Sequence, residues 1–229
     1  MIKPDVKTII RKLKSLSSPE NIEGMARFSI SPDKAFGISK PELRTLAKEI
    51  GKDHKLALEL WKTGYLEARI IASLIDEPEK VTESQMNSWV KDFDSWDVCD
   101  QCCINLFDKT PFALKKIKEW SRAKEEYVKR AAFSLLAVIA VHDKKAANSV
   151  FIKFFPIIKR ESTDKRNFVK KAVNWALRQI GKRNINLNKE AIKLAKEIQK
   201  IEDKTAKWIA SDALKELESK DANIRKPRK

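Results

Sequence analysis

Apolar residues recur at every third or fourth position along most of the chain, which predicts a succession of amphipathic helices. No segment alternates β-branched and polar residues, and the chain has only five glycines, so we expect an all-α fold. Ser18-Pro19, Ser39-Lys40-Pro41 and Thr110-Pro111 read as N-caps followed by an early-helix proline. Gly64 and Gly181 read as helix ends. The predicted helices cover residues 4–16, 19–28, 40–51, 53–62, 65–75, 83–92, 96–107, 111–121, 124–141, 144–158, 164–181, 188–200 and 204–218.

A short pattern repeats in three of these helices, where a basic residue leads into a small, mostly apolar segment. The copies are Arg69–Ile75, Arg130–Leu136 and Lys171–Leu177. Trp208–Leu214 is a weaker fourth copy that lacks the leading base. The second and third copies begin 41 residues apart, and helix pairs of about 40 residues are the signature of HEAT-type arrays. The repeat therefore favours HEAT-like helix pairs; an irregular helical bundle is the alternative.

A HEAT-like array predicts a right-handed α-solenoid whose inner helices line a concave surface. The leading bases of the repeats would then place positive charge along this groove. No linker long enough to divide domains is present, so we expect one repeat domain over residues 1–219. Residues 220–229 are charged and contain Pro227, which is typical of a disordered tail.

The charge balance narrows the class of partner. Lysine and arginine number 48 against 32 acidic residues, giving a net charge of +16, which points to nucleic acid, an anionic membrane surface or an acidic protein. A lysine-rich soluble surface without such a partner is the alternative. No apolar run approaches the ~20 residues of a membrane span, and the N-terminus lacks a secretory pattern. Three cysteines, an odd number, favour a reducing cytoplasm over a disulfide framework.

The helix predicted to begin near Trp96 carries an unusual carboxylate. Trp96, Asp100 and Cys103 share one helical stripe, so Asp100 falls on the apolar side, while Asp97 falls on the other. A carboxylate on an apolar face is costly to bury unless something pairs with it, which makes Asp100 a candidate functional residue. The alternative is a plain helix start, with Ser95 as N-cap and both aspartates favoured by the helix dipole.

The same helix holds all three cysteines. The Cys99-x-x-Cys102 spacing suggests a metal site, but no second cysteine pair exists, and His54 and His142 are distant in sequence. Cysteines in such a helix, including Cys103, are more often small core residues. We therefore expect neither a metal nor another cofactor.

The helix at 164–181 has two opposed stripes. Its core stripe consists of Val169, Ala172, Val173, Ala176 and Ile180. The other stripe contains Lys171, Trp175, Arg178 and Lys182, so the tryptophan lies among three cations. An exposed tryptophan framed by cations suits a nucleic-acid surface, since the ring packs on bases or sugars while the cations hold phosphates. The alternative is a tryptophan buried by the neighbouring repeat, with solvated lysines around it.

Arg130 is a further candidate. It shares a stripe with Ser134 and Ala137, and these small neighbours would let a bulky ligand approach the guanidinium. Arg130 could bind a phosphate or pair with Asp100. An ordinary surface ion pair, for example with Glu126, is an equally good interpretation.

The order Trp96-x-x-x-Asp100, then Arg130, then Trp175-x-x-Arg178, on repeated helix pairs, resembles the AlkD family of HEAT-like DNA alkylation repair glycosylases. The segment 36–44 also resembles the corresponding N-terminal segment of that family. The resemblance extends from about residue 15 to 215. It implies a monomeric, cytoplasmic and nucleoid-associated enzyme that hydrolyses the N-glycosidic bond of N3- or N7-alkylated purines in double-stranded DNA, without flipping the base.

The resemblance also implies roles for individual residues. Trp96 and Trp175 would pack against the deoxyribose of the lesion, Asp100 would sit near its anomeric carbon, and Arg130 would bind the adjacent phosphate. The predicted DNA-binding residues are Arg178, Arg44, Lys40, Ser39, Lys171, Lys182 and Phe28, the last standing where family members can carry a tyrosine that touches DNA.

These residue types fit the chemistry of the family. An alkylated purine already carries positive charge and leaves without a general acid, so the site needs only to stabilise an oxocarbenium-like sugar and position a water. Asp100 would supply the negative charge, and the faces of Trp96 and Trp175 would add cation–π attraction. The cysteine-containing version of the Trp96–Asp100 motif marks a divergent branch. Two alternatives therefore stay open: a non-catalytic DNA-binding paralogue and a HEAT scaffold for an acidic protein.

Overall fold

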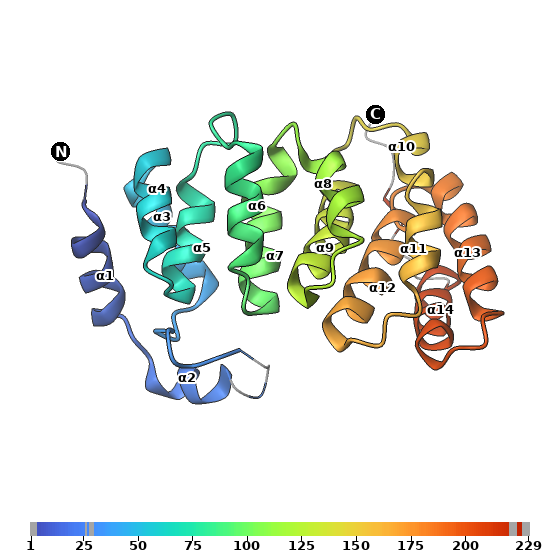
Figure 1. The fold of residues 1–229 in the computed structure, drawn as a ribbon, viewed down its shortest axis with the longest axis horizontal. Helices are drawn as coiled ribbons and strands as arrows, with labels where there is room; N and C mark the ends of the chain where they lie inside the picture. Colours follow the sequence, from blue (N-terminus) through green and yellow to red (C-terminus); the bar gives the residue numbers. More distant parts are fainter. Residues whose placement is uncertain (1–3, 26, 28–29, 220–223, 226–229) are drawn as a thin grey trace. The chain divides into compact units, whose positions relative to one another are not determined.

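The computed structural model describes residues 4–25, 27, 30–219 and 224–225, and every regular element within these ranges is a helix (Figure 1). The chain divides into two compact units, an N-terminal unit, Met1–Phe112, and a C-terminal unit, Ala113–Lys229. The expectation of an all-α fold is confirmed. None of the described helices is both long enough and apolar enough to cross a bilayer.

The N-terminal unit contains seven described α-helices and one 3₁₀ turn. They are α1 (Val6–Ser15), α2 (Pro19–Met25), α3 (Lys40–Ile50), α4 (His54–Lys62), α5 (Leu66–Ile75), α6 (Glu83–Lys91), α7 (Trp96–Asn105) and η2 (Phe107–Lys109). Helix α5 lies at the centre, because α3, α4 and α7 all pack against it. Two stacked rings anchor the core, with the centroids of Trp61 and Trp89 3.9 Å apart.

A buried carboxylate fixes the segment that leads into α3. Glu67 on α5 is fully buried, and its two oxygens accept hydrogen bonds from the backbone N–H groups of Phe36 at 2.9 Å, Gly37 at 2.8 Å and Ile38 at 3.3 Å. Gly37 has a φ of 72°, and a Cβ there would lie 2.5 Å from the carbonyl oxygen of Ser18, so only glycine fits. These contacts set the position at which α3 begins.

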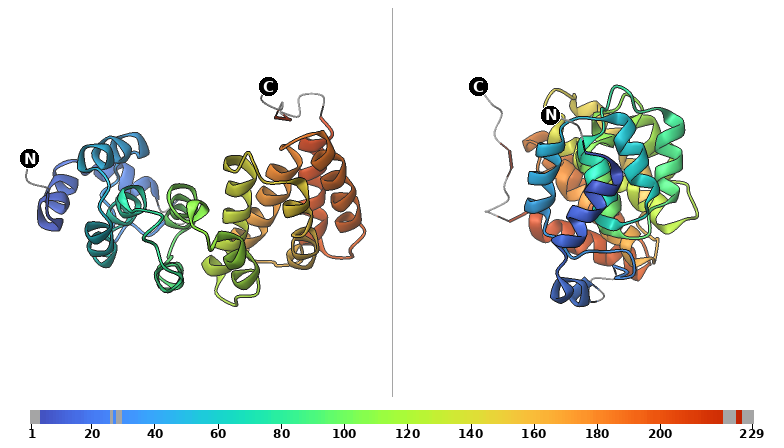
Figure 2. Two further views of the ribbon diagram at one scale, coloured as in Figure 1. Left: turned by 90° about the horizontal axis from the view of Figure 1, so that it is seen from above. Right: turned by 90° about the vertical axis from the view of Figure 1, so that its left-hand side faces the viewer.

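The C-terminal unit contains a second group of helices. They are α8 (Ala113–Trp120), α9 (Glu126–His142), α10 (Asn148–Ile152), α11 (Phe155–Glu161), α12 (Asn167–Gly181), α13 (Ile185–Gln199) and α14 (Lys204–Leu217). Helix α12 packs most extensively against α9, and α13 and α14 pack against each other and against α12 (Figure 2). The predicted core stripe of α12 is confirmed, since all five of its members have no exposed surface.

Several predicted helix boundaries in this unit are wrong. Helix α8 begins at Ala113, so Pro111 precedes it instead of standing in its first turn, and the helix expected at 164–181 begins at Asn167. Two further differences have clear local causes. The single helix expected at 144–158 is two helices, α10 and α11, because Pro156 stands at the start of α11 and has no N–H to continue the α10 ladder. The helix expected at 188–200 begins instead at Ile185, because the side chain of Asn184 accepts a hydrogen bond from the backbone N–H of Leu187 at 3.0 Å.

Two described residues of the predicted tail, Ile224 and Arg225, have defined positions. The guanidinium of Arg225 donates to the carbonyl oxygen of Ala140 at 3.0 Å and to Oε1 of Gln179 at 2.5 Å. Arg183 donates to the same Ala140 carbonyl at 3.1 Å. Burial lowers the pKa of the Arg225 guanidinium, and the charge of Arg183 adds to this shift. At Arg225 the tail is thus docked on α9 and α12.

Candidate functional site

The N-terminal unit carries Trp96 and Asp100 on α7. Ser95 caps this helix as expected, because its Oγ accepts a hydrogen bond from the backbone N–H of Val98. Trp96 and Asp100, one turn apart, are both half-buried. Burial raises the pKa of the Cys103 thiol well above its usual value, and the nearby negative charge of Asp100 contributes to the rise. The predicted stripe is therefore partly exposed at Trp96 and Asp100 and buried at Cys103.

The more deeply buried carboxylate of α7 is Asp97, not Asp100, and the prediction that Asp97 lies on the polar side is wrong. Asp97 is 6% exposed, and its Oδ2 lies 2.5 Å from Nζ of Lys40, the first residue of α3. Lys40 reaches α7 because the preceding segment is anchored on Glu67. The ion pair ties α3 to α7, the helix that also carries Asp100.

The other DNA-binding residues predicted for this unit lie near the start of α3. Ser39 is exposed, and the carboxylate of Glu42 accepts from its backbone N–H at 3.2 Å, as in a capping box, and from its Oγ at 2.6 Å. Arg44 is exposed on α3. Lys40 is held by Asp97, although its side chain remains 30% exposed. Phe28 lies outside the described residues.

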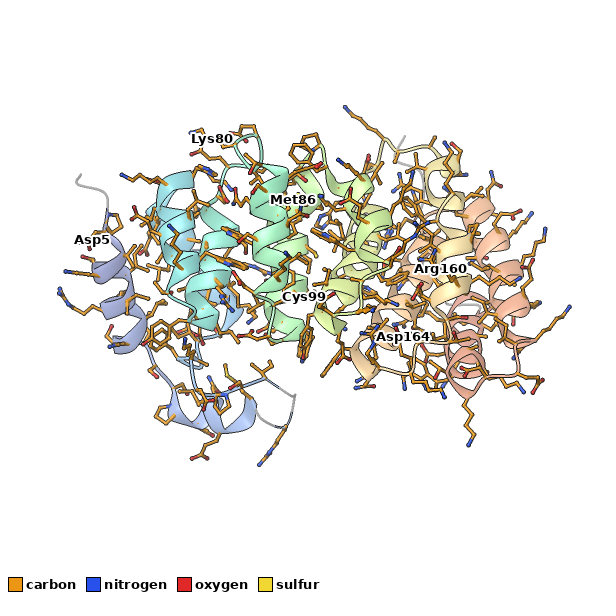
Figure 3. The ribbon with its side chains drawn as sticks, viewed as in Figure 1. Asp5, Lys80, Met86, Cys99, Arg160 and Asp164 are labelled. Atoms are coloured by element: carbon orange, nitrogen blue, oxygen red, sulfur yellow. The ribbon has the colours of Figure 1, made fainter. Side chains whose placement is uncertain are left out.

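The three cysteines are core residues, as predicted. Cys99 (labelled in Figure 3), Cys102 and Cys103 are all buried in α7. Burial raises the pKa of the Cys102 thiol well above its usual value, so this thiol stays protonated at neutral pH. Among the described residues, no group of three or more His, Cys, Asp or Glu side chains is arranged to hold a metal ion.

In the C-terminal unit, Arg130 lies at a helix junction. Its guanidinium donates to the carbonyl oxygen of Phe168 at 2.8 Å, while Glu126 accepts from the N–H of the same residue at 3.3 Å. Arg130 is 6% exposed, and Ser134 and Ala137 have no exposed surface. The expectation that small neighbours leave the guanidinium accessible is therefore wrong, because these positions are small to let α12 pack closely against α9.

The leading base of the first repeat is also engaged. Arg69 donates to the carbonyl oxygen of Asp92 at 2.9 Å, and its guanidinium lies 5.3 Å from the ring centroid of Trp61. Only the leading base of the third copy, Lys171, is exposed. In two of the three copies the leading base thus contacts a neighbouring segment and is largely buried, so the prediction that each leading base adds positive charge to an open surface holds only for Lys171.

The second stripe of α12 is half open and has partners on α14. Trp175 is half-buried, and it shares the stripe with Arg178 and Lys182 as predicted. Glu216 accepts from Lys182 Nζ at 2.5 Å and from Arg178 Nη1, and Asp212 Oδ2 lies 3.7 Å from Arg178 Nε. The prediction of a stripe framed by cations alone is incomplete, since the acidic partners come from a helix more than thirty residues away.

The positive charge is distributed unevenly along the chain. Residues 113–229 contain 31 lysines and arginines against 14 acidic residues, whereas residues 1–112 contain 17 against 18. The net charge of +16 therefore arises entirely from the C-terminal unit. The excess of positive charge thus lies in the C-terminal unit, whereas Trp96 and Asp100 lie in the N-terminal unit.

Sequence reasoning missed one exposed aromatic residue of the C-terminal unit. Trp208 on α14 is 41% exposed, and Nζ of Lys170 on α12 lies 4.5 Å from its ring centroid. The available signal was the tryptophan at the leading position of the fourth repeat copy, where the other copies have a base.

An acidic cluster orders the start of α12 and gives a testable pKa. Burial would raise the pKa of Asp164, but hydrogen bonds from Arg166 and Lys129 lower it to about 2. Because the folded-state pKa is lowered, Asp164 stabilises the fold above the pKa of an unfolded aspartate. This contribution is lost as the pH falls through about 2.

Arg166→Gln is expected to raise the pKa of Asp164, measured by NMR titration of its carboxyl carbon. Arg160→Gln, whose arginine contacts Glu161 instead, should leave it unchanged.

A family model described as DNA alkylation repair enzyme matches residues 9–217. None of the curated proteins compared matches the chain. One solved structure belongs to a new family of proteins related to the HEAT-like repeat DNA glycosylases, with affinity for branched DNA structures. It is 20% identical, covers 98% of this chain and 99% of its own, and has a TM-score of 0.82, so the fold is HEAT-like. An engineered protein, 15% identical over 93% of this chain and 92% of its own, has a TM-score of 0.40.

Proposed function

Because the chain belongs to the DNA alkylation repair enzyme family, we propose that it removes cationic N3- or N7-alkylpurines from duplex DNA by hydrolysing the N-glycosidic bond, without flipping the base. The observation that carries this proposal is the pair Trp96 and Asp100, which lie one turn apart on the partly open stripe of α7. A carboxylate beside an aromatic face suits a developing oxocarbenium ion. The right-handed solenoid with a concave groove stays part of this proposal.

Asp97 and Asp100 divide two tasks between them. Asp97 is buried and forms an ion pair with Lys40, which holds α3 to α7. Asp100 is half-buried on the stripe it shares with Trp96, so part of its surface faces solvent, where a sugar placed against that stripe would meet it. The two carboxylates of α7 therefore have different environments and different roles. Asp97 holds α7 in place, and Asp100 stabilises the charge on the sugar.

The reaction needs few protein groups. As the C1′–N bond breaks, its electron pair leaves with the base, which becomes neutral because it began as a cation. The carboxylate of Asp100 stabilises the positive charge that develops at C1′, and the ring of Trp96 packs against the sugar. We assign Trp175, in the C-terminal unit, to contact with the DNA. A water held by Asp100 then attacks C1′ and loses its proton to solvent or to the carboxylate.

The cations that we assign to the DNA backbone are mostly exposed. Lys171 and Arg44 are exposed, and Lys182 and Arg178 keep part of their surface open. Arg130 is buried, so we assign it to positioning α12 and its Trp175 rather than to direct phosphate binding. The excess of positive charge in the C-terminal unit supports binding to a long polyanion.

A second candidate function is DNA binding without catalysis. The burial of Arg130 favours it, since a residue that the family resemblance assigns to the lesion phosphate is engaged with Phe168. A protein with this fold is described by its affinity for branched DNA, which makes junctions a suitable probe for this candidate.

The two candidates are separated by one assay on the full-length protein. We expect it to release 7-methylguanine and 3-methyladenine from methylated duplex DNA, detected by chromatography of the free bases. Binding to the same duplex, an unmethylated duplex and a four-way junction is measured by fluorescence anisotropy. Binding without release would support the non-catalytic function, and failure to bind any of these DNAs would contradict both.

A further inference from the structure

Two carboxylates of α14 lie against the cations of α12 that the proposed function assigns to DNA. Glu216 is shared, because one oxygen accepts from Lys182 Nζ and the other from Arg178 Nη1. Asp212, one turn earlier, approaches Nε of Arg178 at 3.7 Å. That Nε is buried and has no hydrogen-bond partner among the described residues. Two anions one helical turn apart thus face two cations one turn apart.

Both carboxylates and both cations are charged, and another anion could replace the carboxylates. Burial alone would raise the pKa of Glu216, yet hydrogen bonds from Lys182 and Arg178 lower it, so the carboxylate is ionised at neutral pH. The side chains are only partly buried, with Arg178 30% and Glu216 29% exposed. Ion pairs at this level of exposure add little net stability, so another anion can replace the carboxylates at small cost.

A DNA phosphate is the anion that matches the geometry. Arginine binds carboxylate and phosphate through the same fork of N–H donors, and Lys182 acts as a neighbouring point charge. Arg178 and Lys182 lie on the stripe of Trp175, where the proposed function places the DNA backbone. The unsatisfied Nε of Arg178 shows that the carboxylates satisfy this fork incompletely, which leaves a donor for a better-fitting anion.

We propose that Asp212 and Glu216 are phosphate surrogates: they hold Arg178 and Lys182 in binding orientation when DNA is absent, and they limit affinity for DNA by competing with its phosphates. This inference rests on the proposed function, since it assigns DNA to the α12 stripe. The two carboxylates would weaken binding to undamaged duplex DNA. Undamaged duplex vastly outnumbers any damaged site and would otherwise retain a protein of such high positive charge.

The test is Glu216→Gln, which removes the charge and keeps the shape. We expect its affinity for an unmodified duplex to rise roughly three- to tenfold at about 0.1 M salt, with a salt dependence steeper by about one unit in the log–log slope, because freed cations contact additional phosphate. Glu218→Gln is the matched control. It makes the same change two residues later on the chain, where Glu218 pairs with Lys196 on α13 at 2.8 Å, and it should have a much smaller effect.

Two further variants complete the design. Arg178→Gln in the Glu216→Gln background should remove most of the gain, because the gain depends on the released guanidinium. Asp212→Asn should also raise the affinity for duplex DNA. It replaces Glu216→Gln as the test if Glu216→Gln lowers the thermal unfolding temperature enough to affect the binding measurement.

Several outcomes would overturn the inference. Equal affinities for Glu216→Gln and Glu218→Gln would place Arg178 and Lys182 outside the DNA footprint. Weaker binding by Glu216→Gln would make the carboxylate an aid to DNA binding rather than a competitor. Both results leave the proposed base release intact, and the first removes only the assignment of Arg178 and Lys182 to the DNA backbone. A wild-type protein that binds no DNA would instead refute the proposed function together with the inference.

Discussion

Asp100→Asn is expected to lower the rate of 7-methylguanine release by about 100-fold or more, while affinity for duplex DNA changes by less than about twofold. Asparagine keeps the shape of the side chain but carries no charge, so it cannot stabilise the positive sugar that forms as the base leaves. The carboxylate contributes to the transition state and not to holding the DNA backbone, so its loss appears in the chemical step. Single-turnover base release with saturating protein, beside anisotropy binding, measures both effects.

Asp97→Asn is the matched control for this experiment, since it makes the same change three residues earlier on the same helix. It breaks the ion pair with Lys40 and leaves a buried amide in its place, so we expect a loss of roughly 1–3 kcal/mol in unfolding free energy. Base release per folded molecule should fall far less than in Asp100→Asn. The opposite pattern, with activity lost only in Asp97→Asn, would mean that the catalytic carboxylate has been misassigned.

Glu67→Gln is expected to destabilise the N-terminal unit by roughly 2–4 kcal/mol. The carboxylate accepts three backbone hydrogen bonds in a fully buried position, whereas a glutamine amide offers one oxygen and turns donor hydrogens toward the remaining N–H groups. At least one buried N–H would then lose its acceptor. Urea denaturation, compared with Glu59→Gln at an exposed position of α4, measures the difference.

The consequence of losing Glu67 should extend to α7. The segment it anchors precedes Lys40, which in turn holds Asp97, so a displaced segment would loosen the contact between α3 and α7. Hydrogen exchange in α7 should therefore accelerate in Glu67→Gln and stay unchanged in Glu59→Gln. A variant with wild-type stability and wild-type exchange would show that backbone contacts within the segment suffice to hold it.

Some features of the fold and site follow from sequence alone because they depend on neighbours in the chain. The caps at Ser39 and Ser95 depend on backbone N–H donors within three residues. The core stripe of α12 follows from its period, since this helix has one strongly apolar face and one polar face. Such features are local, so a reading of residues three or four positions apart recovers them.

The errors at the candidate site have a common physical origin. Helix α7 is buried on several sides, so its period does not single out one face, and the helical stripe alone could not identify Asp97 as the buried carboxylate. Its partner, Lys40, lies 57 residues earlier. Arg130 was misread because small neighbouring residues suit a close helix contact as well as an approaching ligand. In each case the deciding partner comes from a distant part of the chain.

The uneven charge of the two units bears on how the protein would meet DNA. Attraction over distances of a Debye length acts on the C-terminal unit and scarcely on the nearly neutral N-terminal unit. Encounters with DNA would therefore be oriented. The cationic C-terminal unit would contact DNA first, and the N-terminal unit, which carries Asp100, would bind afterwards. Ionic strength would then govern the association rate constant, whereas the rate of bond cleavage in the assembled complex would be nearly indifferent to salt.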